Sequence, residues 1–118
     1  MFTSFDKPRM NGRGERMLER LQQTITQRRS ADPATSYVAQ LHARGLPVIA
    51  RKLGEEAVEV VVAALSGTGE ELTAEAADVL FHLLVLLDAR GVPLENVVAE
   101  LERREGTSGV EEKAGRTE

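Results

Sequence analysis

The sequence contains no cysteine and no tryptophan, and only 3% of its 118 residues are aromatic. Without cysteine there is no disulfide framework, no thiolate nucleophile and no cysteine-based zinc site, and this composition fits a reducing cytoplasm. A core with so few aromatic rings is built from leucine, valine and alanine, which suits helices. With 42% hydrophobic and 29% charged residues, the chain is predicted to form one soluble domain.

Long apolar runs and strong positive charge are also missing. The longest apolar stretch, residues 74–87, is too short to cross a bilayer and contains three ionisable residues. Residues 1–14 lack the apolar run of a signal peptide. The formal net charge of −4 disfavours a nucleic-acid surface, although the first 29 residues are locally basic. We therefore expect a cytoplasmic location and a small-molecule partner, with no nucleic acid and no membrane.

Apolar residues recur at helical spacing along most of the chain and predict an all-α fold of about five helices. The predicted helices cover residues 15–29, 36–44, 47–65, 70–90 and 93–104. Ser36 or Thr35 would cap the second helix, and glycines in left-handed positions, Gly45 and Gly91, would end the second and the fourth. These helices define a domain over 15–104, preceded by a mobile tail over 1–14 and followed by a charged C-terminal tail over 105–118.

Residues 58–62 allow a second interpretation, because four of them are valines and valine favours strands. We favour a helix there. A strand would place Glu55 and Glu56 on opposite faces, and no second convincing strand exists to pair with it.

The predicted helix 70–90 is apolar almost all round. A helix without a solvent face must be buried, and one small chain does not supply enough protein to bury it. We therefore predict a bundle completed by dimerisation, in which two copies form a homodimer.

Five carboxylates stand out on these apolar helices: Glu55, Glu56, Glu59, Glu75 and Asp78. Residues three and four apart share a helix face, so each segment stacks like charges that repel one another, more strongly once they are desolvated. A bound cation would remove that penalty. An oxygen-only cage suits Mg²⁺ or Mn²⁺ rather than zinc.

The alternative for the first acidic segment is a solvated face on which Arg51 and Lys52 neutralise the glutamates. Glu75 and Asp78 favour the metal site instead, because an apolar helix seldom tolerates an unpaired carboxylate. His82, four residues after Asp78, is more often a core histidine than a ligand, yet it could contact substrate.

Two further groups have both a structural and a functional interpretation. Lys52 and Arg51 are surface charges by default, but they flank the acidic cage and could bind phosphates. Thr107-Ser108-Gly109 is typical of a turn, and such turns can also cradle a phosphate with their backbone N–H groups.

The acidic pattern, Gly54-Glu55-Glu56-x-x-Glu59 followed by Glu75-x-x-Asp78, resembles the EExxE…ExxD signature of the MazG-like all-α nucleoside triphosphate pyrophosphohydrolases. Within that group the chain is similar to the phosphoribosyl-ATP pyrophosphohydrolase family of histidine biosynthesis. The matching elements are Ser36-Tyr37, Lys52-x-Gly54-Glu55-Glu56, Glu75-Ala76-Ala77-Asp78-x-x-x-His82, Arg90-Gly91-Val92 and the ending Gly106-Thr107-Ser108-Gly109. Leu65 departs from the pattern, because a lysine is expected there, and residues 1–14 match nothing in it.

The resemblance implies a metal-dependent hydrolysis of the α–β phosphoanhydride of phosphoribosyl-ATP to phosphoribosyl-AMP and pyrophosphate, the second step of histidine biosynthesis. By the same resemblance, metal ligands would be Glu56, Glu59, Glu75 and Asp78. Glu55 would share that cage or act as general base, and Lys52 would act with it in catalysis. Substrate would be bound by Arg51, Ser36, Tyr37, His82, Thr107, Ser108 and Lys113.

Two competing functions remain open at the level of sequence. A house-cleaning nucleoside triphosphate pyrophosphohydrolase would use the same cage without needing Ser36-Tyr37 or the Thr107-Ser108-Gly109 ending. A non-catalytic helical dimerisation module would pair the carboxylates with arginines of a partner chain.

Overall fold

A computed structural model describes residues 12–105, and helices make up almost all of this part of the chain. The helices are α1 (Arg13–Arg28), α2 (Tyr37–Arg44), α3 (Leu46–Ser66), α4 (Gly69–Ala89) and α5 (Leu94–Glu105). No strand occurs among the described residues, and residues 58–62 lie inside α3. The all-α prediction is confirmed. No helix in residues 12–105 is long and apolar enough to span a membrane.

The helix bounds differ slightly from those expected from the sequence. The largest difference is in α1, which begins at Arg13 rather than Glu15 and so includes two residues assigned to the N-terminal tail. At the other end, α5 extends through Glu105, the first residue assigned to the C-terminal tail. The remaining parts of both predicted tails, residues 1–11 and 106–118, lie outside the described residues.

Side-chain caps define where two of the helices start. The backbone N–H of Ala39 donates to the Ser36 hydroxyl at 3.2 Å, so Ser36 caps α2 as predicted. Thr68 caps α4 through a reciprocal capping box: the Glu71 N–H donates to the Thr68 hydroxyl, and the Glu71 carboxylate accepts from the Thr68 N–H.

Glycines end α2 and α4, but in two different conformations. Gly91 has φ +69°, and the Val92 N–H donates to the Leu87 carbonyl at 2.9 Å, as in a Schellman motif. Gly45 has φ 99° and ψ 168°, which is an extended region open almost only to glycine, rather than the expected left-handed helical position. The difference arises because Gly45 also precedes α3 directly and must redirect the chain within one residue.

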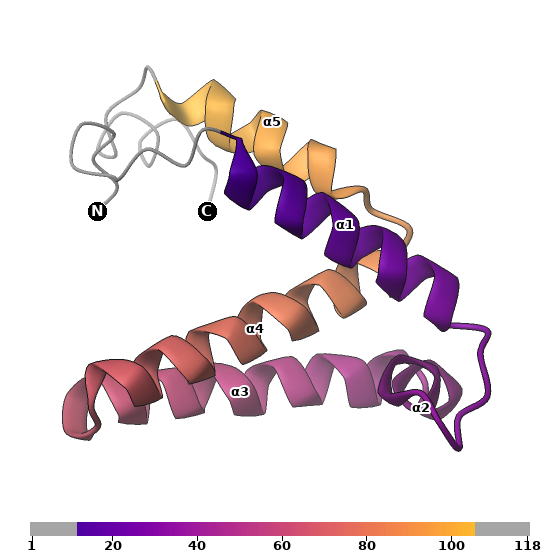
Figure 1. The fold of residues 1–118 in the computed structure, drawn as a ribbon, viewed down its shortest axis with the longest axis horizontal. Coiled ribbons are helices and arrows are strands. Elements are labelled where there is room, and N and C mark those ends of the chain that lie inside the picture. The colour runs from indigo at the N-terminus through magenta and orange to yellow at the C-terminus, as the bar shows by residue number, and fades with distance from the viewer. Residues whose placement is uncertain (1–11, 106–118) are drawn as a thin grey trace.

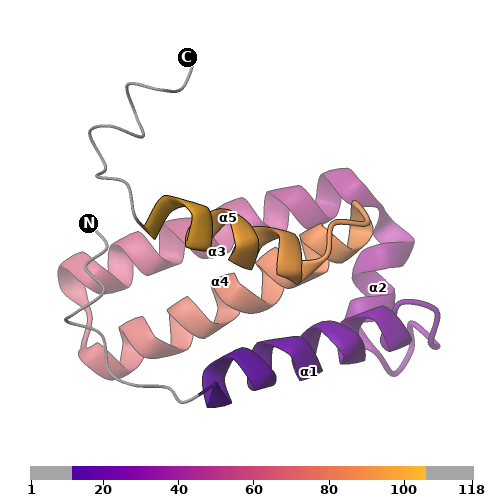
Figure 2. The ribbon, with the colours of Figure 1, turned by 90° about the horizontal axis from the view of Figure 1, so that it is seen from above.

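The helices form two arms (Figure 1). One arm is the antiparallel hairpin of α3 and α4, which lie side by side in both views (Figures 1 and 2). In the other arm, the C-terminal part of α1 packs against the C-terminal half of α4, whereas the start of α1 lies apart from it, and α2 lies across the end where the arms meet.

The hydrophobic core lies at this junction. Its buried side chains come from four helices, and they are Ile25, Val38, Leu41, Ile49, Leu84 and Val85. Leu94 of α5 and Leu18 and Leu21 of α1 pack against it. The core therefore fixes the relative positions of α2, α3 and α4, the helices that carry Tyr37, Glu56 and Glu75.

Within a single chain, α4 is buried only along its C-terminal half. Its buried residues are His82, Leu84, Val85 and Asp88. Leu80, by contrast, is 47% exposed, and Val61 and Leu65 on the facing helix α3 are 56% and 83% exposed. One copy therefore does not bury the apolar surface of the hairpin.

Candidate active site

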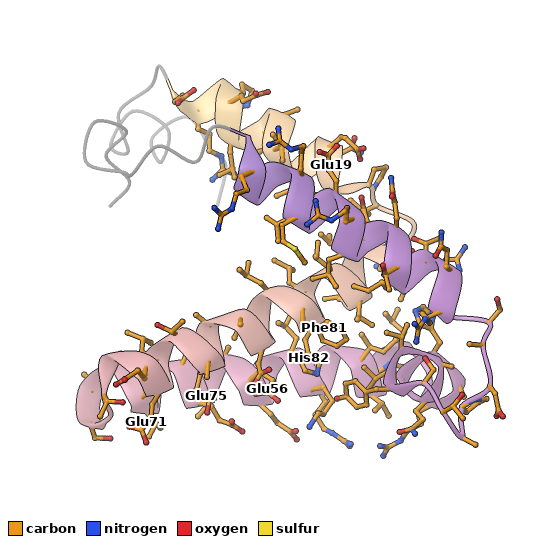
Figure 3. All side chains as sticks on the ribbon, in the orientation of Figure 1. Glu19, Glu56, Glu71, Glu75, Phe81 and His82 are labelled. Carbon is orange, nitrogen blue, oxygen red and sulfur yellow. The ribbon has the colours of Figure 1, made fainter. Side chains whose placement is uncertain are left out.

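A carboxylate cluster lies on the α3–α4 hairpin, beyond the core. Glu56 from α3 and Glu75 and Asp78 from α4 each place one oxygen so that all three oxygens lie within 4.8 Å of one another. Glu56 and Glu75 appear close together along the hairpin in Figure 3. Periodicity explains the pairing, because Glu75 and Asp78 are three residues apart and share one face of α4.

Two oxygens of this carboxylate cluster are shielded from solvent without any hydrogen-bond partner. They are Glu56 Oε2 and Glu75 Oε1. Glu56 as a residue is only 9% exposed. Burying an ionised carboxylate oxygen without a partner is costly, so these two oxygens are left with unused capacity to accept a donor or bind a cation.

The pKa of Glu75 also indicates that the clustered acids repel one another. Its pKa is raised above the ordinary value of 4.5, first by desolvation, then by the charge of Glu59 and a hydrogen bond to it, and then by the charges of Asp78 and Glu56. Neighbouring negative charge and desolvation therefore make ionisation of Glu75 harder than for a free glutamate. Glu59 is exposed and lies near enough to act on Glu75, but it is not one of the three acids whose oxygens converge.

These residues fit a divalent cation. All donors are carboxylate oxygens, which a hard ion such as Mg²⁺ or Mn²⁺ prefers, and the two partnerless oxygens give the site unused ligands.

Glu55 and Glu56 are neighbours in the sequence but occupy different environments. Glu55 points outward, with 51% of its side chain exposed, and forms ion pairs with Arg51 at 3.6 Å and Lys52 at 3.8 Å. The solvated-face interpretation therefore describes Glu55, whereas Glu56 belongs to the cluster. Because Arg51 and Lys52 are both held by Glu55, two cations lie one turn from the clustered acids.

His82 and Tyr37 meet next to the cluster. The Tyr37 hydroxyl and His82 Nε2 are 2.9 Å apart, and His82 Nδ1 lies 2.7 Å from the backbone carbonyl of Asp78. Ser36 is 5% exposed, and its hydroxyl is used as the cap of α2. The other predicted substrate residues, Thr107, Ser108 and Lys113, lie outside the described residues.

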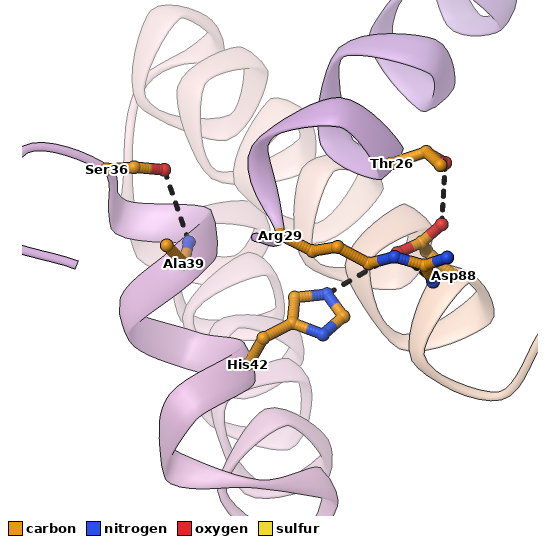
Figure 4. Close-up of polar contacts among 6 residues, drawn as sticks. All are labelled: Thr26, Arg29, Ser36, Ala39, His42 and Asp88. Carbon is orange, nitrogen blue, oxygen red and sulfur yellow. Dashed lines mark hydrogen bonds and ion pairs between the residues drawn. The ribbon is translucent and has the colours of Figure 1, made fainter. Parts of the chain in front are cut away.

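A second acidic site was not predicted from the sequence. Asp88 Oδ1 accepts a hydrogen bond from the Thr26 hydroxyl at 2.6 Å, and Oδ2 accepts one from Arg29 at 3.3 Å (Figure 4). His42 Nε2 lies 3.4 Å from the same Oδ2. The Asp88 side chain is 8% exposed. The partners come from α1, its C-terminal end and α2, so no spacing within one helix could have revealed this site.

An all-α fold that brings two acidic helix segments together on one hairpin is consistent with the MazG-like class of nucleoside triphosphate pyrophosphohydrolases. A family model described as phosphoribosyl-ATP pyrophosphohydrolase matches residues 18–105. The chain belongs to the phosphoribosyl-ATP pyrophosphohydrolase family.

Relatives from several bacteria are similar over most of their length, and each is named phosphoribosyl-ATP pyrophosphatase. The protein of Erythrobacter litoralis is 64% identical over 99 residues, which cover 84% of this chain and 95% of the relative. That of Rhizorhabdus wittichii is 63% identical over 99 residues, covering 84% and 93%. That of Novosphingobium aromaticivorans is 58% identical over 101 residues, covering 86% and 94%.

Proposed function

We propose that this protein hydrolyses the α–β phosphoanhydride of phosphoribosyl-ATP and releases phosphoribosyl-AMP and pyrophosphate, the second step of histidine biosynthesis. The observation that carries the proposal is the carboxylate cluster with its two buried, partnerless oxygens, on a chain whose family and relatives bear the name of this activity. The reaction would take place in the cytoplasm, where its nucleotide substrate is soluble.

Glu56, Glu59, Glu75 and Asp78 would hold Mg²⁺ or Mn²⁺. The ion, when bound, supplies positive charge that offsets the negative charge of the phosphates. The contribution of the chain is to keep the acids fixed on two packed helices, so that little reorganisation is needed when substrate binds.

Lys52 and Arg51 would stabilise charge on the leaving pyrophosphate, because they lie on the same helix as Glu56, four and five residues before it. Their ion pairs with Glu55 restrict where the two cations can point. Glu55 keeps a half-exposed carboxylate there, and we propose it as the group that accepts the proton of the attacking water.

We also propose that two copies form a homodimer through the hairpin arm. The exposed apolar side chains of α3 recur at the three- and four-residue spacing of a helix-packing seam: Val58, Val61, Val62 and Leu65, which are 61%, 56%, 55% and 83% exposed. A second copy would cover this seam and Leu80 of α4. Light scattering should report a dimer that V61K converts to monomer, whereas Q27K, an exposed change on α1 in the other arm, should leave it dimeric.

Selection of phosphoribosyl-ATP over other nucleotides requires contacts to its additional ribose phosphate. Thr107, Ser108 and Lys113 carry the donors and the positive charge for such contacts, and we propose that they provide them. Deletion of residues 106–118 should then raise KM for phosphoribosyl-ATP and leave any slow hydrolysis of ATP unchanged.

The test of the proposed function is pyrophosphate release from phosphoribosyl-ATP measured beside a panel of canonical and damaged nucleoside triphosphates. The proposal expects kcat/KM for phosphoribosyl-ATP to exceed that of the others by orders of magnitude. Comparable values across the panel would establish the house-cleaning function instead, and no release from any member would favour a non-catalytic module.

A further inference from the structure

Three rings gather beside the carboxylate cluster. Tyr37 at the start of α2 stacks on Phe81 of α4, with ring centroids 6.0 Å apart and planes at 21°. His82 packs edge-on against both rings, at 5.7 Å from Tyr37 and 5.2 Å from Phe81. Figure 3 shows Phe81 and His82 next to Glu56 along the hairpin. His82 is four residues, or about 6 Å of helix, from Asp78 of the cluster.

A chain of hydrogen bonds fixes the orientation of the Tyr37 ring. A backbone carbonyl only accepts, so His82 Nδ1 must carry the proton that it shares with the Asp78 carbonyl at 2.7 Å. In the neutral imidazole Nε2 is then the acceptor, and the Tyr37 hydroxyl donates to it at 2.9 Å. The Ser36 cap fixes the backbone on the other side of Tyr37, as Figure 4 shows for its bond with Ala39.

Tyr37 and His82 differ in the exposed surface and the free polar atoms that each can offer to a ligand. His82 is 5% exposed and both its nitrogens are engaged, so it has no free polar atom to offer. Tyr37 is 44% exposed, although its hydroxyl and one face of its ring are occupied. An exposed ring that is already fixed in place can stack on a planar ligand with little further loss of conformational entropy.

We propose that Tyr37 stacks on the purine base of the nucleotide whose phosphates lie at the carboxylate cluster, and that His82 is a positioning residue that acts through Tyr37. This inference rests on the proposed function, and it replaces the expected contact of His82 with substrate by an indirect role. Stacking of a base on an aromatic side chain strengthens binding by about tenfold or more.

The sequence supplies a direct probe, because it contains one tyrosine and no tryptophan. Intrinsic fluorescence of the full chain above 300 nm therefore reports Tyr37 alone. In the presence of Mg²⁺, phosphoribosyl-AMP, which carries the base, should quench this emission with the same midpoint at which it inhibits turnover. Inorganic pyrophosphate, which lacks a base, should not quench it. Free N-acetyltyrosinamide at the same nucleotide concentrations corrects for light absorbed by the purine.

Two results would overturn the inference. One is an unchanged emission at concentrations of phosphoribosyl-AMP that inhibit turnover. The other is equal quenching by pyrophosphate, which would mean that Tyr37 senses the phosphate site and not the base.

Variants test the positioning role by separating KM from kcat. Y37L should raise KM about tenfold with little change in kcat, whereas Y37F, which keeps the ring but not the hydroxyl, should raise it less. H82A should resemble Y37F, and H82Q, which retains an acceptor near the position of Nε2, should restore KM. In the Y37L background H82A should add nothing, because residues that act through one another are not additive.

An additive effect of H82A in that double variant, with unchanged melting temperatures, would refute the positioning role. The proposed function is judged separately, by the nucleotide panel with the wild-type protein. Preferred turnover of phosphoribosyl-ATP combined with an unaltered KM in Y37L would reject the stacking and leave the proposed function intact.

Discussion

Helix α4 carries acids in two contrasting environments. Asp88, in the C-terminal half, has donors from Thr26 and Arg29 and lies beside His42, so its charge is compensated by the fold itself. Glu75, in the N-terminal half, faces Glu56 and Asp78 and has an oxygen that no group satisfies. The Asp88 site connects α1, α2 and α4, whereas the carboxylate cluster places like charges close together between α3 and α4.

The contrast separates an acid with donors around it from acids that, on the proposed function, are held in place for a ligand. A buried carboxylate with donors around it contributes to stability, and removing it leaves those donors unsatisfied. A cluster of carboxylates without donors costs stability in the absence of a cation, and removing one of them relieves repulsion. Substitutions at the two sites should therefore change stability and activity in opposite ways.

Substitutions in the carboxylate cluster should have the largest effect of all, and this effect is on turnover. Asp78→Asn and Glu59→Gln each remove a negative oxygen and keep the shape, so kcat/KM should fall about 1,000-fold while helicity is retained. The metal-free melting temperature should stay constant or rise. Glu70→Gln, an exposed acid in the first turn of α4, is the matched control. Near-wild-type turnover of Asp78→Asn at low Mg²⁺ would remove Asp78 from the site.

The opposite pattern is expected at Asp88. Asp88→Asn should lower the free energy of unfolding by about 2 kcal/mol, because Arg29 loses its counter-charge at a side chain that is only 8% exposed. Thr26→Val, which removes one hydrogen bond, should lower it by about 1 kcal/mol. Below the melting transition both variants should retain kcat. Urea unfolding that leaves Asp88→Asn as stable as wild type would show that the two sites do not differ in this way.

The pH dependence of stability gives a smaller but directional effect. Since the pKa of Glu75 is raised in the folded state, Glu75 binds its proton more tightly there than in the unfolded chain. Its contribution is fully present below the ordinary value of 4.5 and is lost as the pH rises through the folded pKa. In EDTA, wild type should lose stability over that rise relative to Glu75→Gln. If the melting temperatures of wild type and Glu75→Gln change with pH in parallel, the negative charges around Glu75 do not repel it as proposed.

A second acid with a shifted pKa, Glu100, lies on α5. Hydrogen bonds from Arg103 and Arg104 lower the pKa of Glu100 to about 2, so its contribution is lost only as the pH falls below 4.5 towards that value. The two pH windows therefore separate Glu75 from Glu100.

The smallest effect on stability is expected from Glu55→Gln, because its ion pairs with Arg51 and Lys52 are exposed. The free energy of unfolding should change by less than about 0.5 kcal/mol. The Mg²⁺ concentration at the midpoint of thermal stabilisation should also stay constant, whereas Glu56→Gln should raise it. A shifted midpoint in Glu55→Gln would place Glu55 inside the metal site and sharpen the boundary of the cluster.

Sequence periodicity was enough to predict the helices and the two acidic segments, because both depend on residues close in the chain. It also placed Glu75 and Asp78 on one face of α4, where their oxygens converge in the structure. It could not separate Glu55 from Glu56, because that choice depends on the rotation of α3 against α4. The site of Asp88 was missed because its partners lie about 60 residues away in the sequence. The positioning of Tyr37 by His82 was hidden for the same reason.

If the partnerless acids bind a divalent cation and Asp88 does not, the two sites respond differently to Mg²⁺. Thermal unfolding in EDTA and then in increasing Mg²⁺ tests this difference on wild type, Glu56→Gln/Glu75→Gln and Asp88→Asn. Wild type and Asp88→Asn should each gain about 2.7 kcal/mol when Mg²⁺ reaches 100 times its Kd, and the double variant should gain almost nothing. A wild-type melting temperature that does not respond to Mg²⁺ or Mn²⁺, or an equal response in the double variant, would contradict the account.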